Sequence, residues 1–328
     1  MKKDLRIVFT SAGVVGVEEQ AAPAGPVGVD EVAGRSVVSL VSAGTELAVL
    51  RQGAFWAPFP FAPGYATVFE VEEAGAEVRG IQAGDRVLTM SPHGLYQRRK
   101  AEDVAVVPEG LDPEVAVFAR MMAVSMCTLA TTAARPPAGV VVTGLGLVGN
   151  LAAQIFQACG YETVACDPAE NRRTLAQRCG VRDVRTGVPV DDPGIAGRAA
   201  LVAECSGHEQ TTLEACRVVR HGGEVVLVGL PWTKKAELSA HEVLHALFMN
   251  YVRLRSGWEW EVPLHPEAFR PNSVFEHFEG ALRWLAEGRI RTEGLAVSHS
   301  PREAVDAYRS LLERRCEGLT VLFDWRGV

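Results

Sequence analysis

The sequence predicts an α/β protein made of a β-rich, barrel-like unit and a second unit with a doubly wound parallel sheet. Short β-type runs separated by Gly and Pro turns fill the first hundred residues, whereas Ala-rich helical segments alternate with wholly apolar runs from Pro113 onward. Apolar runs without alternation are typical of strands buried on both faces, and strand–helix–strand repetition favours a parallel sheet. A G-x-G-x-x-G motif directly follows one apolar run and indicates the same fold class.

The β-rich unit is predicted from five short runs. Turn-forming sequences such as AGPVG, APG and QAGD separate them, and few helical patterns interrupt them. The runs are Arg6 to Thr10, Arg35 to Ser42, Ala66 to Glu72, Arg86 to Met90 and Val104 to Val107. We therefore expect this part of the chain to fold as a barrel-like sheet.

The parallel sheet is predicted from four apolar runs further along the chain. They are VVVTG up to residue 144, ETVACD (162–167), AALVAECSG (199–207) and GGEVVLVGL (222–230). After about Pro263, we expect a helix (274–287), a short strand (294–299) and a second helix (302–314). A final strand, LTVLFDW, closes the chain.

Composition and charge exclude several classes of function. The 328 residues include 33 basic and 40 acidic side chains, so the net charge is −7 and no basic field exists to hold nucleic acid or an anionic membrane. No apolar run approaches the roughly 18 residues of a membrane span, and the N-terminus turns polar too soon for a signal peptide. The seven cysteines show no C-x-x-C pair. We expect a cytoplasmic protein with reduced thiols and without nucleic-acid or membrane partners.

Gly144, Gly146 and Gly149 form the G-x-G-x-x-G motif between the strand run AGVVVT and a predicted helix. The first glycine permits a tight turn, the second lets backbone N–H groups approach a pyrophosphate, and the third allows close packing of helix and strand. The helix begins with Leu147 and Val148, and its N-terminus would face the phosphates. The motif predicts dinucleotide binding; a purely structural glycine turn is the alternative.

The next predicted strand ends at Asp167, 18 residues beyond Gly149, where a carboxylate can accept both ribose hydroxyls of NAD. A 2′-phosphate about 4 Å from that carboxylate would meet a repulsion on the order of 4 kcal/mol, so NAD(H) is favoured. Arg172 or Arg173 could still accommodate NADP(H). The alternative is an acid that caps the helix beginning at Pro168.

The ends of two more predicted strands are expected to meet the cofactor, because the carboxyl ends of parallel strands share one edge of the sheet. We expect backbone contacts to the ribose and the carboxamide there, and strand-end packing is the alternative. The residues are Cys205, Ser206 and Gly207 on one strand, and Val228, Gly229 and Leu230 on the other.

Residues 241–245 read HEVLH, which matches the helical zinc-protease signature. Histidines at i and i+4 share a helix face and can grip one metal ion. The motif lies between two predicted strands of the parallel sheet, where a crossover helix belongs and a third metal ligand is not expected. We therefore interpret His241 and His245 as neighbours on a partly exposed helix, with a zinc peptidase as the alternative.

Four stretches resemble the medium-chain dehydrogenase/reductase family, the zinc alcohol dehydrogenase superfamily, over nearly the whole chain. They are SAGTE (42–46), APGYA (62–66), ARMMAVSMC (119–127) and the ending AYRSLLERRCEGLTVLFDW. The first and the last look most like the branch that contains bacteriochlorophyllide hydroxyethyl dehydrogenase. The resemblance implies a GroES-like catalytic domain of residues 1–117 and 265–328 and a Rossmann domain of residues 118–264. It also implies a homodimer joined through the sheet edges of the nucleotide domains.

The resemblance implies, in addition, that the catalytic zinc of the family is absent. Ala43 stands at the Cys ligand position, Tyr65 and Ala66 replace a His-Glu pair, and Arg120 falls where a Glu is expected. An alanine, a tyrosine and a guanidinium do not form a tetrahedral zinc site. We therefore predict a zinc-independent enzyme that transfers a hydride between NAD(H) and a small-molecule secondary alcohol or ketone. The alternatives are reduction of an activated C=C bond, as in quinone and enoyl reductases, and a non-catalytic dinucleotide-binding sensor.

Without a metal, side chains must polarise the carbonyl group and move a proton. Thr45 occupies the family's proton-relay hydroxyl position, and Tyr65 offers a phenol at the lost His site. Arg120 could hold a substrate carboxylate or stabilise an oxyanion, and His93 could relay a proton. The alternatives are a turn or cap for Thr45, a packed aromatic ring for Tyr65, a structural ion pair for Arg120 and a solvated loop histidine for His93.

Overall fold

The computed structural model describes residues 3–23, 25–54, 56–270 and 272–328, and the chain divides into two compact units. Unit 1 comprises Met1–Arg120, Phe278–Glu287 and Thr292–Val328; unit 2 comprises Met121–His277 and Gly288–Arg291. Residues 265–277 and 288–291 thus belong to unit 2, whereas we expected them in the catalytic domain, and residues 118–120 belong to unit 1, whereas we expected them in the Rossmann domain. Backbone hydrogen bonds from Val274 and Phe275 to Pro263 and Leu264 keep the segment 265–277 with the preceding chain.

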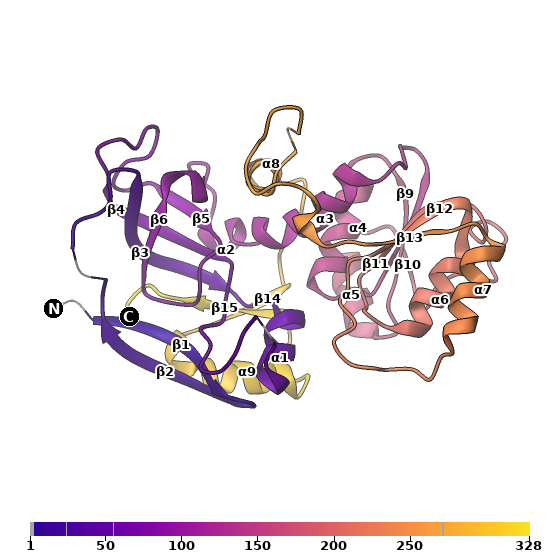
Figure 1. Cartoon of the computed structure of the whole chain (residues 1–328), viewed down its shortest axis with the longest axis horizontal. Helices are drawn as coiled ribbons and strands as arrows, with labels where there is room; N and C mark the ends of the chain where they lie inside the picture. The colour runs from indigo at the N-terminus through magenta and orange to yellow at the C-terminus, as the bar shows by residue number, and fades with distance from the viewer. Residues whose placement is uncertain (1–2, 24, 55, 271) are drawn as a thin grey trace. The chain divides into compact units, whose positions relative to one another are not determined.

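Unit 2 is built on a six-stranded parallel sheet (Figure 1). Its strands lie in the order β10-β9-β8-β11-β12-β13, so the direction of winding reverses between β8 and β11. The strands are β8 (Gly139–Thr143), β9 (Glu162–Cys166), β10 (Asp183–Arg185), β11 (Ala199–Glu204), β12 (Val219–Leu227) and β13 (Arg253–Ser256). The predicted doubly wound parallel sheet is confirmed, and ligands bind such sheets at the reversal.

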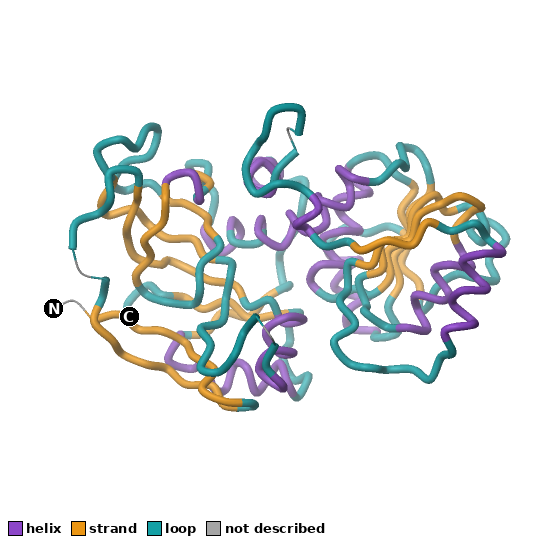
Figure 2. The backbone as a smooth tube through the Cα atoms, viewed as in Figure 1, coloured by secondary structure: helices purple, strands orange, loops and turns teal. Residues whose placement is uncertain are grey.

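Helices cover both faces of this sheet, as the tube in Figure 2 shows. Val140 and Val142 of β8 pack in one core cluster, whereas Val141 packs in another on the opposite face, because successive residues of a strand alternate. The first cluster includes side chains of α4 (Leu147–Ala158) and α5 (Glu170–Arg178), and the second includes side chains of α6 (Glu209–Val218) and α7 (Ala240–Met249). Burial on both faces explains the continuous apolar runs.

Unit 1 is a sheet domain. A seven-stranded sheet runs in the order β14-β15-β3-β4-β5-β7, with β6 paired to β3, and β1 and β2 form a separate antiparallel hairpin. The strands are β1 (Lys3–Ser11), β2 (Val14–Ala21), β3 (Glu31–Leu40), β4 (Thr67–Ala74), β5 (Arg86–Thr89), β6 (Tyr96–Lys100), β7 (Ala105–Val106), β14 (Ala296–His299) and β15 (Thr320–Asp324). All five strand runs predicted in this part of the chain therefore contain a strand.

The helices of unit 1 and the segments linking the units complete the fold. Unit 1 holds α1 (Ala43–Gln52), α2 (Pro113–Ala116) and α9 (Ala304–Leu312), while α3 (Ala119–Thr131) and α8 (Val274–Ala286) contribute residues to both units. Short 3-10 turns span Ala101–Asp103, Glu259–Glu261 and Pro301–Glu303. Sequence analysis did not predict α1, because Gly44 in its first turn lowers helix propensity.

One helical segment, Pro113–Thr131, is 19 residues long and apolar enough to cross a membrane by composition alone. Our expectation that no run approaches this length is therefore wrong. The most apolar window of the segment is 67% buried inside the protein, and Met121 and Met122 are almost fully buried. A core helix has the same composition, so the segment is explained by packing.

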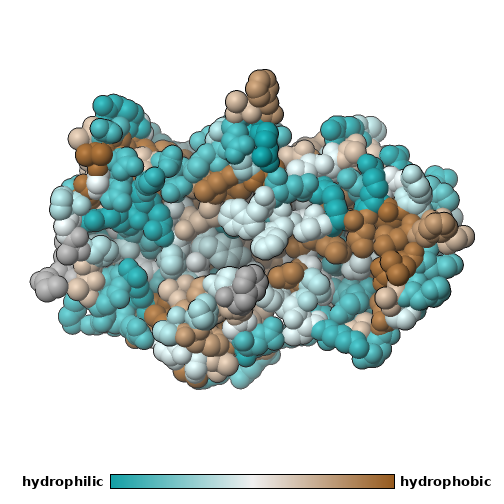
Figure 3. Space-filling view, in the orientation of Figure 1, coloured by the Kyte–Doolittle hydropathy of each residue, from teal (hydrophilic) through white to brown (hydrophobic). Residues whose placement is uncertain are grey.

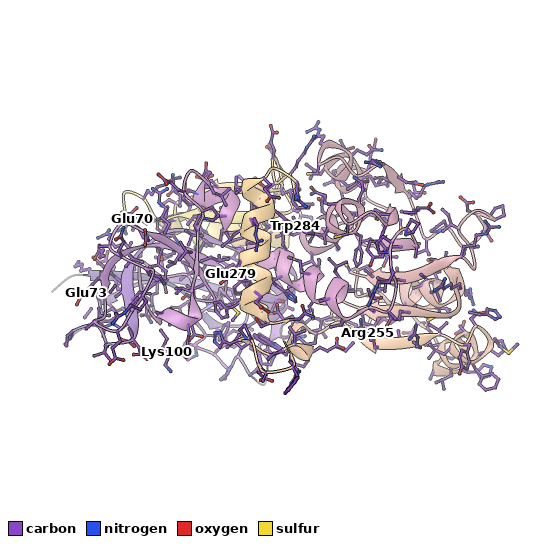
Figure 4. All side chains as sticks on the ribbon, turned by 90° about the horizontal axis from the view of Figure 1, so that it is seen from above. Glu70, Glu73, Lys100, Arg255, Glu279 and Trp284 are labelled. Atoms are coloured by element: carbon purple, nitrogen blue, oxygen red, sulfur yellow. The ribbon has the colours of Figure 1, made fainter. Side chains whose placement is uncertain are left out.

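The outer strand β13 of unit 2 carries a charged side chain, whereas the preceding helix α7 and the residues just after it expose apolar side chains. Arg255 of β13, labelled in Figure 4, pairs with Glu261 at 2.7 Å and Glu224 at 3.5 Å. Four large hydrophobic side chains on and after α7 are more than half exposed: Leu244, Phe248, Met249 and Tyr251. Hydrophobic surface gathers on this part of unit 2 in Figure 3.

Candidate functional site

The glycine loop of unit 2 has the geometry that the motif predicts. Gly144 has φ +79°, and a Cβ there would lie 2.8 Å from Ser206. A Cβ on Gly149 would lie 1.7 Å from the carbonyl oxygen of Gly144, so this glycine is required for close packing of α4 against the loop. A Cβ on Gly146, in contrast, would meet nothing within 4 Å. The loop is therefore tight behind Gly144 and Gly149 and open at Gly146, which fits the close approach of a pyrophosphate.

The N-terminus of α4 adjoins this open position. Gly146 is the N-cap residue, and Leu147 and Val148 form the first turn without an acidic side chain. The first N–H groups of a helix lack intrahelical partners and carry partial positive charge, which favours a bound phosphate. The structure thus brings the predicted glycines, Leu147 and Val148 together at one end of the parallel sheet.

Asp167 lies directly after β9 and is 3% exposed. Its Oδ2 accepts a hydrogen bond of 2.8 Å from Leu145 N in the glycine loop, and its Oδ1 accepts one of 2.8 Å from Ala169 N. Arg172 Nη1 lies 3.3 Å from the same carboxylate. Asp167 therefore holds the glycine loop at the end of β9 and bonds to the N-terminal region of α5, as the helix-capping alternative predicts. Its recognition of a ribose stays a prediction. Oδ2 accepts hydrogen bonds from both Leu145 N and Arg172 Nη1, whereas Oδ1, which accepts from Ala169 N, has a second lone pair that can accept from a ribose hydroxyl.

The end of β11 is organised by a buried carboxyl group that sequence analysis did not single out. Glu204 is fully buried and accepts hydrogen bonds from Ser206 N (2.8 Å), Gly207 N (3.1 Å) and Thr143 Oγ1 (3.2 Å). Burial raises the pKa of Glu204 above its ordinary value, although the hydrogen bonds from Ser206, Gly207 and Thr143 oppose this shift. The carboxyl group thus fixes the turn after β11 beside the glycine loop. An acidic residue inside an apolar run was the available signal.

The turn after β12 packs against the turn after β11. A Cβ on Gly207 would lie 2.7 Å from the Leu230 carbonyl oxygen, and a Cβ on Gly229 would lie 2.5 Å from Gly207 N. The backbone N–H groups of Val228 and Gly229 both donate to the Glu204 carbonyl. Lys235 Nζ, also missed in the sequence, donates to the Gly207 carbonyl at 2.8 Å.

These contacts bring the predicted residues 205–207 and 228–230 side by side. The strand-end packing that we named as the alternative is present. Leu230 is nevertheless 58% exposed, so part of this end faces outward. Burial and neighbouring acidic groups raise the pKa of Cys205, which makes its thiol a poor nucleophile.

A second group of predicted residues meets in unit 1. The Tyr65 hydroxyl donates a short hydrogen bond to Ser42 Oγ and lies 3.5 Å from Thr45 Oγ1. The guanidinium carbon of Arg120 lies 4.7 Å from the centroid of the Tyr65 ring and 5.6 Å from that of Phe278, and Arg120 is 2% exposed. The structure thus places Tyr65, Thr45 and Arg120 together, and it adds Ser42, which the sequence analysis missed.

His93 lies one step behind this cluster. Its Nδ1 is 2.8 Å from Ser39 Oγ, and its Nε2 is 3.1 Å from Glu46 Oε2, which also accepts a hydrogen bond from Tyr308 OH at 2.5 Å. Because His93 is fully buried, the alternative of a solvated loop histidine is wrong. Burial and the Glu46 carboxyl group hold the pKa of Tyr308 well above its ordinary value.

The positions at which the resemblance implies zinc ligands include Ala43, Tyr65 and Arg120. Ala43 has no donor atom in its side chain, the Tyr65 hydroxyl donates to Ser42 Oγ, and Arg120 carries a permanent positive charge beside the Tyr65 ring. Within the residues that the structure describes, no group of three or more His, Cys, Asp or Glu side chains could hold a metal ion.

The HEVLH helix is explained by capping. Glu242 Oε2 accepts a hydrogen bond of 2.9 Å from Ser239 N, and Ser239 Oγ accepts one from Glu242 N, so the two residues form a capping box at the start of α7. His241 and His245 are exposed neighbours with ring centroids 5.8 Å apart, as our interpretation predicts.

Residues 148–259 match the family described as zinc-binding dehydrogenases. Two alcohol dehydrogenases of Geobacillus stearothermophilus are similar in sequence. One is 28% identical over 209 residues, which cover 52% of this chain and 61% of that protein. The other is 26% identical over 311 residues, which cover 80% of this chain and 83% of that protein. The first alignment therefore spans less than two thirds of that relative.

Solved structures share the fold over almost the whole chain. Galactitol-1-phosphate dehydrogenase from Escherichia coli has a TM-score of 0.81 at 18% identity, covering 98% of this chain and 99% of that chain. A putative zinc-binding dehydrogenase from Sinorhizobium meliloti 1021, bound to NADP, has a TM-score of 0.79 at 19% identity, covering 99% and 100%. These likenesses confirm the predicted fold class. The chain is therefore similar, in part of its sequence and in its fold, to medium-chain, zinc-type dehydrogenases.

Proposed function

We propose that the protein is a zinc-independent, NAD(H)-preferring oxidoreductase that interconverts a secondary alcohol and a ketone, within the zinc-lacking branch that its sequence resembles. The observation that carries this proposal is the Tyr65 hydroxyl, hydrogen-bonded to Ser42 and 3.5 Å from Thr45, with the Arg120 cation over its ring. This arrangement supplies a proton donor and a positive charge without a metal ion.

Hydride transfer to a ketone requires one proton on the carbonyl oxygen, and the reverse reaction requires its removal. A bound nicotinamide dinucleotide supplies or accepts the hydride. Tyr65 gives its hydroxyl proton to the forming alkoxide during reduction and takes a proton from the alcohol during oxidation. In this proposal Thr45 Oγ1, beside the phenol oxygen, relays the compensating proton from solvent to the phenolate during reduction and from Tyr65 to solvent during oxidation.

The preference for NAD(H) rests on Asp167. A buried carboxylate at the end of β9 accepts ribose hydroxyls and repels a 2′-phosphate. Arg172, only 3.3 Å away, weakens that repulsion, and a neighbour with the same fold is bound to NADP. We therefore propose a preference rather than strict selection, and we expect NADH to bind more tightly than NADPH. Fluorescence titration of the purified protein with each cofactor measures the ratio.

Zinc independence rests on the donor set around Tyr65. A buried guanidinium 4.7 Å from the ring would repel a divalent cation, and the three family ligand positions offer no thiolate, imidazole or carboxylate. We expect turnover to survive dialysis against a chelator, in a sample whose zinc content is measured before and after. Stoichiometric zinc whose removal abolishes turnover would contradict the proposal.

The decisive experiment measures NADH oxidation with a panel of ketones, enones and quinones. Turnover of ketones supports the proposal; turnover of enones or quinones alone would support the C=C reductase instead. Binding of NADH without turnover of any carbonyl compound or alcohol would support the sensor. We expect Tyr65→Phe to lower kcat about 10²–10⁴-fold and Thr45→Ala to lower it less, with NADH affinity unchanged in both.

A matched control for Tyr65→Phe is Tyr96→Phe. Tyr96 lies on β6, where its hydroxyl accepts a hydrogen bond from Arg35 Nη1, outside the Tyr65 cluster. We expect Tyr96→Phe to leave kcat unchanged. Retained turnover in both Tyr65→Phe and Thr45→Ala would reject our assignment of the proton donor.

The proposal includes a homodimer and a cytoplasmic location. The strand β13 is one of the two outer strands of the sheet, so a second copy could extend the sheet there. The exposed Leu244, Phe248 and Met249 of α7, the helix that precedes β13 in the chain, offer apolar surface for a contact between copies. All seven cysteines are free thiols, which suits a reducing compartment. Analytical ultracentrifugation should detect a dimer that Phe248→Glu dissociates.

A further inference from the structure

The Tyr65 cluster contains two residues whose contribution the proposed reaction leaves open. Ser42 Oγ accepts a hydrogen bond from the Tyr65 hydroxyl, and the Arg120 guanidinium lies over the face of the Tyr65 ring. Phe278 lies on the Arg120 guanidinium as well, 5.6 Å from its carbon to the ring centroid. Ser42, Thr45, Tyr65, Arg120 and Phe278 all belong to unit 1, so these contacts form within one compact unit.

The Ser42 hydroxyl bonds to the Tyr65 phenol and does not cap the helix α1. It occupies the N-cap position of α1, where a serine hydroxyl usually accepts a hydrogen bond from the first turn. Within the described chain its hydroxyl makes no such bond. The backbone N–H of Ser42 instead donates a hydrogen bond of 2.7 Å to Glu46 Oε1. The hydroxyl accepts from Tyr65, and because a hydroxyl both accepts and donates, it can turn its own proton toward a phenolate oxygen.

Arg120 adds a positive charge at a place where water is excluded. Its side chain is 2% exposed, and a cation over an aromatic face is attracted by the ring. The attraction grows when the ring carries the negative charge of a phenolate, since charges interact more strongly away from water. A guanidinium remains charged throughout the physiological pH range, so this field is permanent.

Tyr308 shows what the opposite environment does to a phenol in the same unit. Its hydroxyl donates to Glu46 Oε2, and burial together with that carboxyl group raises its pKa well above 10.0. Tyr308 therefore stays protonated. Two tyrosines of unit 1 thus have opposite partners, a carboxyl group for Tyr308 and a guanidinium for Tyr65, which is the pattern that separates a structural phenol from a reactive one.

We propose that Ser42 and Arg120 are positioning residues that hold the Tyr65 hydroxyl and stabilise its phenolate form. This inference deepens the proposed function and rests on it for its catalytic consequence. During ketone reduction the O–H bond of Tyr65 breaks and its proton bonds to the carbonyl oxygen, while the hydride of the reduced dinucleotide bonds to the carbonyl carbon. The phenolate left behind accepts a hydrogen bond from Ser42 and recovers a proton from water.

The direct test is an NMR titration of the full-length protein labelled with carbon-13 at the phenol carbon of tyrosine. The chain has five tyrosines, and the signal lost in Tyr65→Phe identifies Tyr65. We expect its titration midpoint to rise by about one pH unit in Arg120→Gln and by a smaller amount in Ser42→Ala. Ser42→Thr, which keeps the hydroxyl, should restore the midpoint of the parent protein.

The matched control is Arg35→Gln. Arg35 also lies over a tyrosine ring in unit 1, 5.2 Å from the centroid of Tyr96, and donates to its hydroxyl. This variant should leave the Tyr65 midpoint unchanged. Because Arg120 is buried, Arg120→Gln can fail to fold; Arg120→Lys, which keeps the charge but loses the planar stack, and Ser42→Ala then carry the test. We expect an intermediate midpoint in Arg120→Lys.

A kinetic readout separates this inference from the proposed function. Alcohol oxidation needs the phenolate, so its kcat should rise with pH through the Tyr65 midpoint. That rise should move to higher pH in Arg120→Gln by the same amount as the NMR midpoint, with the KM for NAD unchanged. A Tyr65 midpoint that moves in neither Ser42→Ala nor a folded Arg120 variant overturns the inference. A midpoint that moves while the pH profile of kcat stays fixed supports the inference and overturns Tyr65 as the proton donor.

Discussion

The two candidate sites of this protein are made from different parts of the polypeptide. In unit 2 the glycine loop is built from glycines and backbone groups within a short stretch of chain, where added atoms at Gly144 and Gly149 would collide with backbone. In unit 1 the Tyr65 cluster is built from side chains on separate elements, joined by hydrogen bonds and a stacked cation. A substitution of a loop glycine therefore acts through a steric clash, whereas a substitution in the Tyr65 cluster removes individual hydrogen bonds or charges and changes the free energy by a smaller amount.

The largest effect we expect is that of Gly149→Ala. A Cβ 1.7 Å from the Gly144 carbonyl oxygen forces α4 away from the loop, so we expect the free energy of unfolding to fall by about 3 kcal/mol or more and NADH binding to be lost. Denaturant unfolding and NADH titration on the same sample measure both quantities.

Gly146→Ala is the matched control in the same loop. Its backbone has φ −64°, which alanine adopts freely, and the added Cβ meets nothing within 4 Å. We expect unfolding to be unchanged, while NADH affinity falls about tenfold or more because the methyl group occupies the space for the pyrophosphate. If Gly146→Ala binds NADH as tightly as the parent protein, the dinucleotide does not bind over this loop.

The next effect concerns Glu46→Gln in unit 1. Glu46 accepts hydrogen bonds from Ser42 N and Tyr308 OH and lies 3.1 Å from His93 Nε2, all buried. An amide nitrogen at one oxygen position turns an acceptor into a donor, so we expect a loss of roughly 2–3 kcal/mol in the free energy of unfolding. NADH affinity should not change, because the glycine loop belongs to unit 2.

Tyr308→Phe provides the graded comparison for Glu46→Gln. It removes one hydrogen bond to Glu46 and keeps the ring in the core, so we expect a smaller loss of about 1–2 kcal/mol. Equal losses in both variants would mean that the contacts of Glu46 with Ser42 and His93 add no stability, and a fall in NADH affinity in either variant would mean that the two regions are not independent.

The same difference explains what the sequence reveals. Gly144, Gly146 and Gly149 recur at fixed spacing after an apolar run, so a local pattern predicts both the parallel sheet and the loop. Tyr65 and Arg120 were found only because they stand at ligand positions of a family that the chain resembles. No periodicity connects Glu46 to Tyr308, which lie 262 residues apart in the sequence, and Ser42 was predicted only as the last residue of a strand run.

Errors in predicting individual elements have equally local causes. The helix α1 was missed because Gly44 interrupts its first turn. The strand β2 was missed because it is largely exposed and lacks a buried apolar face, and β6 was missed because it is short and largely polar. His93 follows SP and precedes Gly, which is typical of a solvated loop, yet tertiary packing buries it beneath Ser39 and Glu46. Loop-forming residues in a sequence predict a backbone turn, but they do not predict whether tertiary packing buries that turn.

A smaller effect is expected for cofactor choice in Asp167→Ser. Removing the carboxylate abolishes repulsion of a 2′-phosphate and leaves Arg172 to attract it, so the ratio of NADPH to NADH affinity should rise by about tenfold. Part of the NADH affinity should be lost as well, because the ribose hydroxyls lose their acceptor. Titration with both cofactors measures the ratio, and Asp183→Ser, on the outer strand β10, is the control that should leave it unchanged. An unchanged ratio in Asp167→Ser would remove this residue from cofactor recognition.

The smallest effect we expect is a pH dependence of the free energy of unfolding that comes from His277 in unit 2. It tests whether a titrating side chain contributes to the stability of the unit that carries the glycine loop. Burial lowers the pKa of His277 below its ordinary value of 6.5, while Glu276 and Glu259 oppose the shift. The unfolded chain therefore binds a proton more readily than the folded one. The stabilisation is present above pH 6.5 and is lost as the pH falls through the lowered value. We expect His277→Gln to flatten this slope in denaturant unfolding measured across that range. His245→Gln, at an exposed position of α7, should keep the slope, and a slope unchanged in His277→Gln would assign the pH dependence to another group.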